Sequence, residues 1–312
     1  MNRSFFVGLI AVMTATSVWG IQLPIAKDAF AVVDLYHLTS IRYAIPALIM
    51  LPMLALLEGR QSLSYRGAAV PAVVLGVIGM CGSPMLVFIG MAMSRAEHAA
   101  VIVALQPSIA AVALWLLRGL RPAIFTIGCM SLALLGVVLV VTKGNIIFVD
   151  SLRQLVGDVL IFIGAACWVV YTMGTSRLAG WSTWRITVLT MIPGAVATVI
   201  ATEILVFSRH IQTPSSAQLL EVGWEISYLT FIGVVFAMLA WNFGNRRIGP
   251  QNSTLLINLV PISAFVFRAV QGYRFEWIEI VGAALVVMAL VANNLYLRAQ
   301  HVRLTRVGTT AG

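Results

Sequence analysis

The chain contains ten apolar runs, each about 20 residues long, which is the length a helix needs to cross a lipid hydrocarbon layer. They cover residues 5–26, 36–57, 70–92, 97–117, 122–142, 156–177, 185–207, 227–245, 250–270 and 277–297. Because no water inside a membrane can satisfy peptide groups, a spanning segment is either a helix or part of a closed barrel. The runs lack the alternation of apolar and polar residues that barrel strands show. We therefore expect an all-α, multi-pass membrane protein with ten transmembrane helices.

The composition excludes a water-soluble domain of ordinary type. Only 10% of the residues are charged and 60% are hydrophobic, whereas soluble domains carry about 25% charged residues. The three cysteines, Cys81, Cys129 and Cys167, all lie inside the apolar runs, where cysteine behaves as a small apolar residue. We expect no disulfide, no metal site and no cofactor.

The positions of the basic residues predict the orientation of the chain, because short cytoplasmic loops retain lysine and arginine. The loops on the side of the N-terminus hold more of these residues, namely Arg3, Arg60, Arg66, Arg118, Arg121, Arg177, Arg185, Arg246, Arg247, Arg298, Arg303 and Arg306. Both termini are therefore predicted to be cytoplasmic, and we expect the protein in the inner (cytoplasmic) membrane of the cell. The net charge of +9 is explained by this topology, so we expect contact with membrane lipid and no nucleic-acid partner.

The second half of the chain repeats the first. At one constant spacing, the residues that coincide include Gly79 with Gly233, Gly90 with Gly244, Pro107 with Pro261 and Gly128 with Gly282. At a slightly shorter spacing, Trp19 coincides with Trp168 and Gln22 with Tyr171. We expect a first five-helix repeat in residues 1–150, and a second in 151–312 that includes a short basic tail.

Because five is an odd number of crossings, the second repeat must enter the membrane upside down relative to the first. Inverted repeats of this kind hold a substrate near the middle of the membrane, between the two halves. The alternative is that the duplication only makes a stable helical bundle.

Several short motifs resemble one known family. The matching segments are Ser17-Val18-Trp19-Gly20-Ile21-Gln22-Leu23-Pro24, Ile41-Arg42-Tyr43, Leu105-Gln106-Pro107, Gly157-Asp158 with Ala165, Ala166, Trp168 and Tyr171, and Leu259-Val260-Pro261. Together they resemble EamA-type members of the drug/metabolite transporter superfamily. The resemblance covers nearly the whole chain and implies export of small metabolites such as amino acids. The family often has a Gly-Glu pair after the fourth and ninth helices, where this chain has Arg118-Gly119-Leu120 and Gln271-Gly272-Tyr273.

Two prolines lie near the middle of the fourth and ninth runs and are candidate hinges. Pro107 and Pro261 each remove a backbone donor and bend a helix, which exposes carbonyl groups that a neighbour or a cavity must satisfy. Polar side chains precede each proline at helical spacing, namely His98 and Gln106 before the first, and Gln251, Thr254 and Asn258 before the second. They are candidate substrate ligands, although such groups also join helices in many membrane bundles.

Aromatic and amide side chains supply further candidate ligands, namely Trp19, Gln22, Trp168, Tyr171, Trp241 and Asn242. Trp181, Trp184 and Trp277 are more typical of the interfacial belt. Arg42 lies well inside the second run, where a charge requires a partner. It could bind an anionic group of the cargo, be held by a carboxylate such as Asp34 or Asp28, or extend to the membrane surface. Arg268 lies nearer its helix end and is expected to extend to the surface.

The sequence favours a secondary carrier for a small, neutral or zwitterionic metabolite. No aspartate or glutamate lies in the middle third of any run, so facilitated diffusion or exchange is favoured, with proton coupling through His98 as the variant. A receptor or scaffold that keeps the carrier architecture stays open as an alternative. An intramembrane enzyme is disfavoured, because the histidines match no metal-binding spacing and no catalytic group is indicated. The oligomeric state is not predicted.

Overall fold

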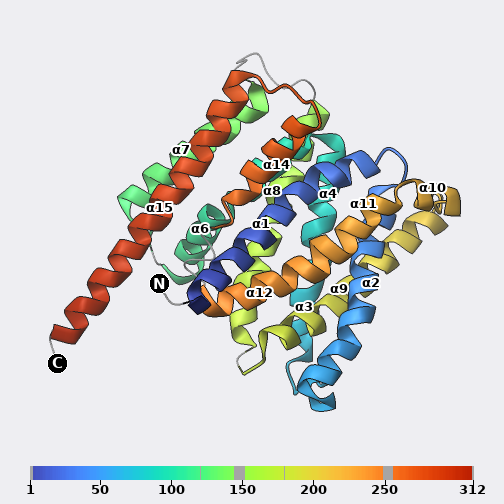
Figure 1. The fold of residues 1–312 in the computed structure, drawn as a ribbon, viewed down its shortest axis with the longest axis horizontal. Helices are drawn as coiled ribbons and strands as arrows, with labels where there is room; N and C mark the ends of the chain where they lie inside the picture. The colour runs from blue at the N-terminus through green and yellow to red at the C-terminus, as the bar shows by residue number, and fades with distance from the viewer. Residues whose placement is uncertain (1–2, 120, 144–151, 179, 249–255, 311–312) are drawn as a thin grey trace.

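A computed structural model describes residues 3–119, 121–143, 152–178, 180–248 and 256–310. All regular elements in these ranges are helices, and they pack side by side as Figure 1 shows. Eight helices are long and apolar enough to cross a membrane. They are Arg3–Ala29 (α1), Leu35–Glu58 (α2), Ala69–Met93, Ile124–Thr142 (α7), Leu152–Gly174 (α8), Thr183–Phe207 (α9), Gly223–Asn245 and Trp277–Leu297 in α15. The span Ala69–Met93 consists of α3 (Ala69–Gly76), η2 and α4 (Ser83–Met93), and the span Gly223–Asn245 consists of α11 (Gly223–Ser227), η4 and part of α12.

The two remaining predicted spans are those that contain the candidate hinge prolines. The fourth is a pair of helices, α5 (Ala96–Val103) and α6 (Gln106–Arg118), which are long enough to cross only together and are bent by 43° at the break between them, as in a broken span or a re-entrant loop. The ninth is described only in part, as the shorter apolar helix α14 (Leu259–Val270). The described chain thus supports a polytopic helical membrane protein with eight spans, or nine if the bent pair is one.

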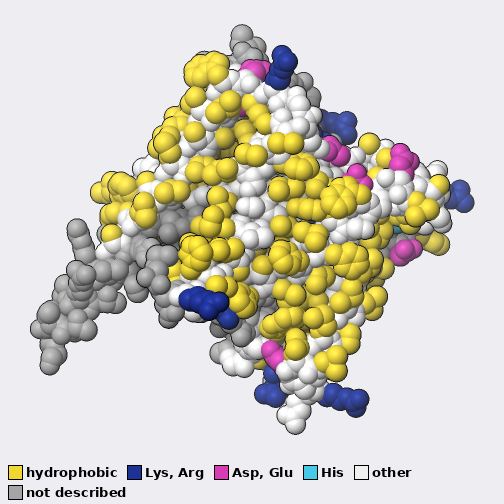
Figure 2. All heavy atoms as spheres, viewed as in Figure 1, with side chains coloured by type: hydrophobic (Ala, Val, Ile, Leu, Met, Phe, Trp, Pro, Cys, Tyr) yellow, Lys and Arg dark blue, Asp and Glu magenta, His cyan; other side chains and the backbone are white. Residues whose placement is uncertain are grey.

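Short helices complete the described elements. The loops contain η1 (Arg60–Leu63), η3 (Thr175–Arg177) and α10 (Ser216–Glu221). Helix α12 runs over Ala237–Ile248, and α15 continues past its expected end to Thr310. Hydrophobic side chains cover most of the middle of the face in Figure 2, and charged side chains lie toward its edges. This distribution matches a protein whose sides face lipid.

Glycines let the helices approach closely at equivalent places in the two halves. A methyl group on Gly90 of α4 would lie 2.3 Å from the carbonyl oxygen of Gly157 in α8, and one on Gly244 of α12 would lie 2.5 Å from that of Gly8 in α1. These four glycines are related by the sequence repeat, so each half packs its first helix against the third helix of the other half. In lipid, the hydrophobic effect does not drive helices together. Close van der Waals packing at small residues stabilises the helix contacts instead.

A wider helical turn recurs in both halves. The third span contains the π-helix η2 (Val77–Gly82), and the eighth contains the π-helix η4 (Tyr228–Phe236). Gly79 in η2 makes room for the ring of Tyr171, and Gly233 in η4 makes room for the side-chain amide of Gln22. Turns of this type are frequent at functional sites, and here the two turns make equivalent contacts in the two halves, since the repeat relates Tyr171 to Gln22.

Helices α1 and α8 run in opposite directions. Lys27, near the end of α1, donates to the carbonyl oxygen of Ser94 at 2.9 Å. The hydroxyl of the same Ser94 donates at 2.5 Å to Asp158, which lies near the beginning of α8. The end of the first helix and the beginning of its repeat counterpart therefore lie at the same end of the bundle, as Figure 1 also shows.

Helices α7 and α15 form a separate pair beside the other helices (Figure 1). Gly136 and Gly282 face each other there, since a methyl group on either would lie 2.6 Å from the carbonyl oxygen of the other. Val101 of α5 packs in the same buried apolar cluster as Val140 of α7 and Val286 of α15. The pair is thus attached to the bundle through α5.

We predict that Gly90→Ala destabilises the protein by about 1–3 kcal/mol, the usual cost of overpacking. The added methyl group would meet backbone, which cannot move aside as a flexible side chain can. The measurement is the free energy of unfolding in detergent. Gly128→Ala is the matched control, because nothing lies within 4 Å of the position where its methyl group would be placed. Equal stability of the two variants would contradict the close crossing of α4 and α8.

Candidate functional site

The first group of candidate ligands meets where α1 packs against η4 and α12. The indole Nε1 of Trp19 donates to the carbonyl oxygen of Gly233 at 3.0 Å. The rings of Trp19 and Trp241 lie 5.3 Å apart and are tilted by 44°. Trp19 contacts both of the larger buried apolar clusters, one around Phe88 and one around Tyr43. It therefore lies at the junction between them.

Arg42 lies next to this group and is almost completely buried, with 5% of its surface exposed. Its Nη2 donates to the Oε1 of Gln22 at 3.3 Å, and its guanidinium lies 5.1 Å from the ring centre of Tyr43 and 4.8 Å from that of Phe88. Its Nε has no hydrogen-bond partner. Two aromatic rings and an amide offset only part of the cost of burying a cation.

The carboxylates suggested as partners of Arg42 are occupied elsewhere. Asp34 caps the beginning of α2 and contacts His37 at 2.5 Å. Asp28 accepts from Gln271 at 2.8 Å and pairs with Arg268 at 3.4 Å. Among the described residues, no carboxylate pairs with Arg42. The guanidinium is thus a buried positive charge with hydrogen-bonding capacity left over.

The second group of candidate ligands lies on α8, α9 and α12. Trp168 and Tyr171 have ring centres 5.2 Å apart, and the Tyr171 hydroxyl lies 3.1 Å from the hydroxyl of Thr190. The side chain of Asn242 donates to Thr187 at 3.1 Å. Trp168 packs against the same apolar cluster that contains Tyr43 and Tyr171 and that Trp19 also contacts. The structure therefore brings Trp19 and Trp168, which the repeat relates, to one shared cluster with Tyr171.

The helix breaks lie at the two candidate hinges. Pro107 is the second residue of α6, directly after the bend, and Gln106 is the first. Pro261 lies in the first turn of α14, and Asn258 immediately precedes that helix. Asn258 is 3% exposed, yet neither its Nδ2 nor its Oδ1 has a partner among the described residues. A buried amide without partners calls for an explanation such as a ligand or a water molecule. Gln251 and Thr254 lie outside the described residues.

His98 does not join these groups. It is completely buried and lies against Asp158 and Ser94 instead, where α5 meets the beginning of α8. Sequence reasoning missed both partners, because they lie near span ends on other segments. The available signal was the Gly157-Asp158 motif, which puts a carboxylate beside a glycine at a close helix crossing.

A network of ion pairs joins helices of both halves at the same end of the bundle. The Glu97 carboxylate of α5 is 2% exposed and lies 2.8 Å from Arg268 of α14 and 3.4 Å from Arg95. Arg95 also pairs at 3.0 Å with Glu279 of α15, whose side chain is 0% exposed. Burial alone would lower the pKa of the Arg95 guanidinium. The neighbouring Glu97 and Glu279 carboxylates outweigh this effect, so the pKa of Arg95 is raised above the ordinary pKa of arginine. Arg268, which was expected to extend to the surface, is 24% exposed and pairs both with the buried Glu97 and with the exposed Asp28.

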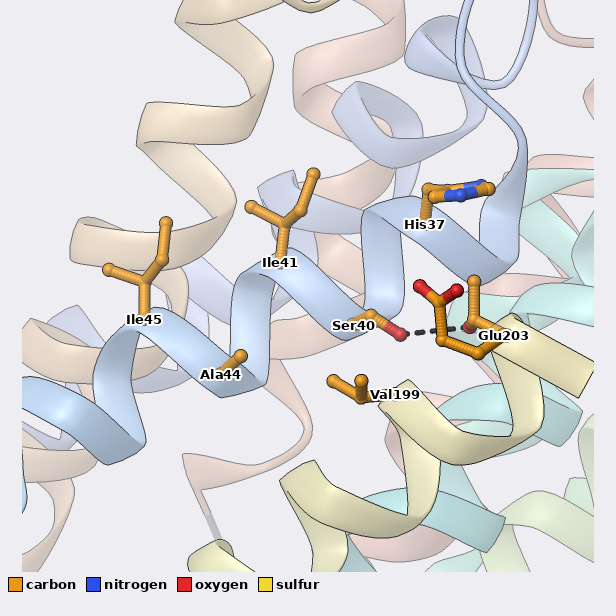
Figure 3. Close-up of a pocket in the computed structure, with 8 residues that line it drawn as sticks. His37, Ser40, Ile41, Ala44, Ile45, Val199 and Glu203 are labelled. Carbon is orange, nitrogen blue, oxygen red and sulfur yellow. Dashed lines mark hydrogen bonds between the residues drawn. The ribbon is translucent and has the colours of Figure 1, made fainter. Parts of the chain in front are cut away.

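A groove lies between α2 and α9, as Figure 3 shows. It has a volume of about 240 Å³ and contains a hydrogen bond of 2.9 Å between Ser40 and Thr202. The remaining lining residues are mostly apolar, with His37 and Glu203 at one end. None of the candidate ligands from the sequence lines this groove, so it is distinct from the groups around Trp19 and Trp168.

Comparison with known proteins agrees with this architecture. The EamA-like transporter family model matches the chain twice, over residues 6–142 and 155–295. An uncharacterized transporter of Bacillus subtilis (strain 168), YrdR, is 32% identical over 302 residues, which cover 96% of this chain and 94% of that protein. A second from the same organism, YyaM, is 30% identical over 261 residues, covering 82% and 83%.

More distant matches agree on the fold. An uncharacterized transporter of Archaeoglobus fulgidus is 25% identical over 211 residues, covering 65% of this chain and 70% of that protein. One solved crystal structure of a protein shares the fold with a TM-score of 0.64 at 19% sequence identity, over 94% of this chain and 98% of that one. The family model, matched in both halves, and the two Bacillus relatives decide the assignment. The chain belongs to the EamA-like transporter family.

Proposed function

We propose that this multi-pass membrane transporter exports small neutral or zwitterionic metabolites, with amino acids as the first class to test. The observation that carries the proposal is Arg42, a buried guanidinium held by Gln22 and two aromatic rings without a carboxylate partner among the described residues. A cargo carboxylate would supply the missing partner through charge-assisted hydrogen bonds. The nearby Trp19 and Trp241 rings offer a surface for its ammonium group or side chain.

The remaining candidate ligands extend this site across both halves. We include in it Trp168 and Tyr171 of α8, Asn242 of α12, and Gln106 and Asn258 at the helix breaks. A site shared by two halves is the arrangement that alternating access needs, since one half can move against the other around a fixed cargo. We propose the ten-helix inverted repeat, with residues 1–150 and 151–312 as its halves, as the basis of this movement.

The proposal also includes the orientation of the chain in the inner membrane. With both termini in the cytoplasm of a cell bounded by its inner membrane, the ion-pair network of Glu97, Arg268, Arg95 and Glu279 lies at the outer end. It joins α5 of the first half to α14 and α15 of the second. These pairs hold that end closed, and they must separate before cargo leaves to the outside.

We predict that Arg42→Gln lowers the affinity for a transported amino acid by about 10- to 100-fold. The reason is the loss of charge-assisted hydrogen bonds worth about 1.5–3 kcal/mol. The measurement is exchange of labelled amino acids by purified protein in liposomes, together with exchange of the corresponding amines that lack the carboxylate. The variant should discriminate less between an amino acid and its amine than the wild type does.

The matched control is Arg60→Gln, since Arg60 is exposed in the short helix η1. Thermal unfolding in detergent checks that the Arg42 variant is folded. An Arg42→Gln protein that is folded and keeps wild-type affinity would exclude Arg42 as the carboxylate ligand. Absence of exchange by the wild type across all amino acids would remove this cargo class.

We predict that Arg268→Gln opens the end closed by ion pairs. Removing one partner of a buried pair costs about 3–5 kcal/mol, and Glu97 would keep only the longer contact to Arg95. The readout is the rate at which a bulky maleimide labels Ala99→Cys, a completely buried position two residues after Glu97. The native Cys81, Cys129 and Cys167 are first replaced by alanine. The labelling rate should rise at least about tenfold, which corresponds to 1.4 kcal/mol.

Lys143→Gln is the control for this experiment, because Lys143 and Glu276 form an exposed pair on the same end of the bundle. Exposed pairs contribute about 0–1 kcal/mol, so labelling should stay close to wild type. If Arg268→Gln labels no faster than Lys143→Gln, the network does not hold this end closed.

A further inference from the structure

His98 and Asp158 form a buried acid–base pair between α5 and α8. The Nδ1 of His98 lies 3.2 Å from both carboxylate oxygens of Asp158. The side chains are 0% and 8% exposed, respectively. The Ser94 hydroxyl donates to Asp158 at 2.5 Å and lies 3.1 Å from His98, and Gln154 lies 3.5 Å from the same ring nitrogen. The Nε2 of His98 is buried and has no partner.

The charged groups on the helices packed around this pair have other contacts, except Arg153, which is exposed. They are Lys27 on α1, Arg95 before α5, Glu97 on α5, Arg153 on α8, Arg268 on α14 and Glu279 on α15. Glu97 and Glu279 each face a guanidinium, which keeps its proton throughout the physiological range. Asp158 faces the imidazole of His98, and an imidazole, unlike a guanidinium, can be either neutral or charged. Within the described part of the chain, this is the buried carboxylate whose ion pair can be switched by one proton.

The position of the pair ties it to both halves. His98 lies on the fourth span of the first half, and Asp158 lies on the helix that also carries Trp168 and Tyr171. Ser94, which bonds Asp158, accepts from Lys27 of α1 through its carbonyl oxygen. A change of charge at the pair therefore acts where α1, α5 and α8 meet. Intramembrane ionisable groups of this kind are typical of proton relays.

We propose that His98 and Asp158 are the proton-binding site that couples this transporter to the pH gradient, a role that rests on the proposed function. The pair takes up one proton, and its charge changes from −1, with neutral imidazole and carboxylate, to zero, with imidazolium and carboxylate. In the proton-bearing state, the ion pair holds α8 against α5. Loss of the proton leaves an uncompensated buried carboxylate and releases that contact. A proton moving inward is thereby exchanged for cargo moving outward.

The first experiment uses purified protein in liposomes, with labelled amino acids as the probe and the membrane voltage clamped. A gradient of two pH units should drive uneven distribution of a transported amino acid by up to about 100-fold, since each unit contributes a factor of ten. Asp158→Asn and His98→Gln should abolish this accumulation and keep exchange at equal pH. Glu276→Gln, which removes an exposed carboxylate, should behave like wild type.

The second experiment needs no cargo. Nitrogen-15 labelling of the histidines follows their protonation in detergent, and the His98 signals are those that disappear in His98→Gln. In the wild type, these signals should respond to a change of pH. In Asp158→Asn that response should change, because the neighbouring charge is lost. This readout also shows that the variant is folded, because the other three histidine signals should be unchanged.

The outcomes separate this proposal from the proposed function. Exchange without any response to the pH gradient leaves the carrier intact and overturns the proton site. Loss of exchange and accumulation together in both variants gives the pair a structural role and also overturns it. If the wild type moves no amino acid, the cargo class fails, and the proton site is then decided by titration alone. His98 signals that do not titrate, or that are unaffected by Asp158→Asn, overturn it.

Discussion

The structure depends on the absence of water inside the membrane, which makes a buried polar group costly unless it finds a partner in the protein. Many of these partners come from the other half of the chain. Trp19 of the first helix bonds the backbone of Gly233, and Ser94 before the fourth span bonds Asp158 of the sixth. These contacts are possible because glycine pairs such as Gly90 and Gly157 bring the helix backbones close together. Close packing and polar pairing are therefore two effects of the same duplication.

Much of the architecture could be predicted from the sequence, because helix length and the positions of small residues are local properties. Eight of the ten apolar runs correspond to described helices long enough to cross a membrane, and most of the glycines that coincide in the repeat lie at close helix contacts. The glycine match also has a limit. Gly128 coincides with Gly282, yet only Gly282 lies at a close crossing. A repeat shows which positions are equivalent, and not which of them are in contact.

The contacts of the charged residues could not be predicted, because they depend on how far each helix is shifted along its neighbours. Arg268 looked like a surface anchor, since it lies near a helix end, but Glu97 of another helix meets it at the same depth. The π-helices were also missed, because their extra residue per turn is stabilised by neighbouring helices. For the candidate site, the sequence indicated Trp19, Gln22 and Arg42, which the structure places together. Their role in binding cargo stays a prediction.

The position of a carboxylate along an apolar run is a poor guide to how buried it is in the structure. Glu97, Asp158 and Glu279 lie near span ends, which favoured a carrier without proton coupling. In the structure, all three are buried, because several helix ends converge there and exclude solvent. What distinguishes them is the partner. A guanidinium keeps its charge beside a carboxylate, whereas an imidazole can be neutral or charged, which is why we propose the pair of His98 and Asp158 as the proton site. A transporter can thus keep one end closed with permanent ion pairs and still place one switchable pair between its halves.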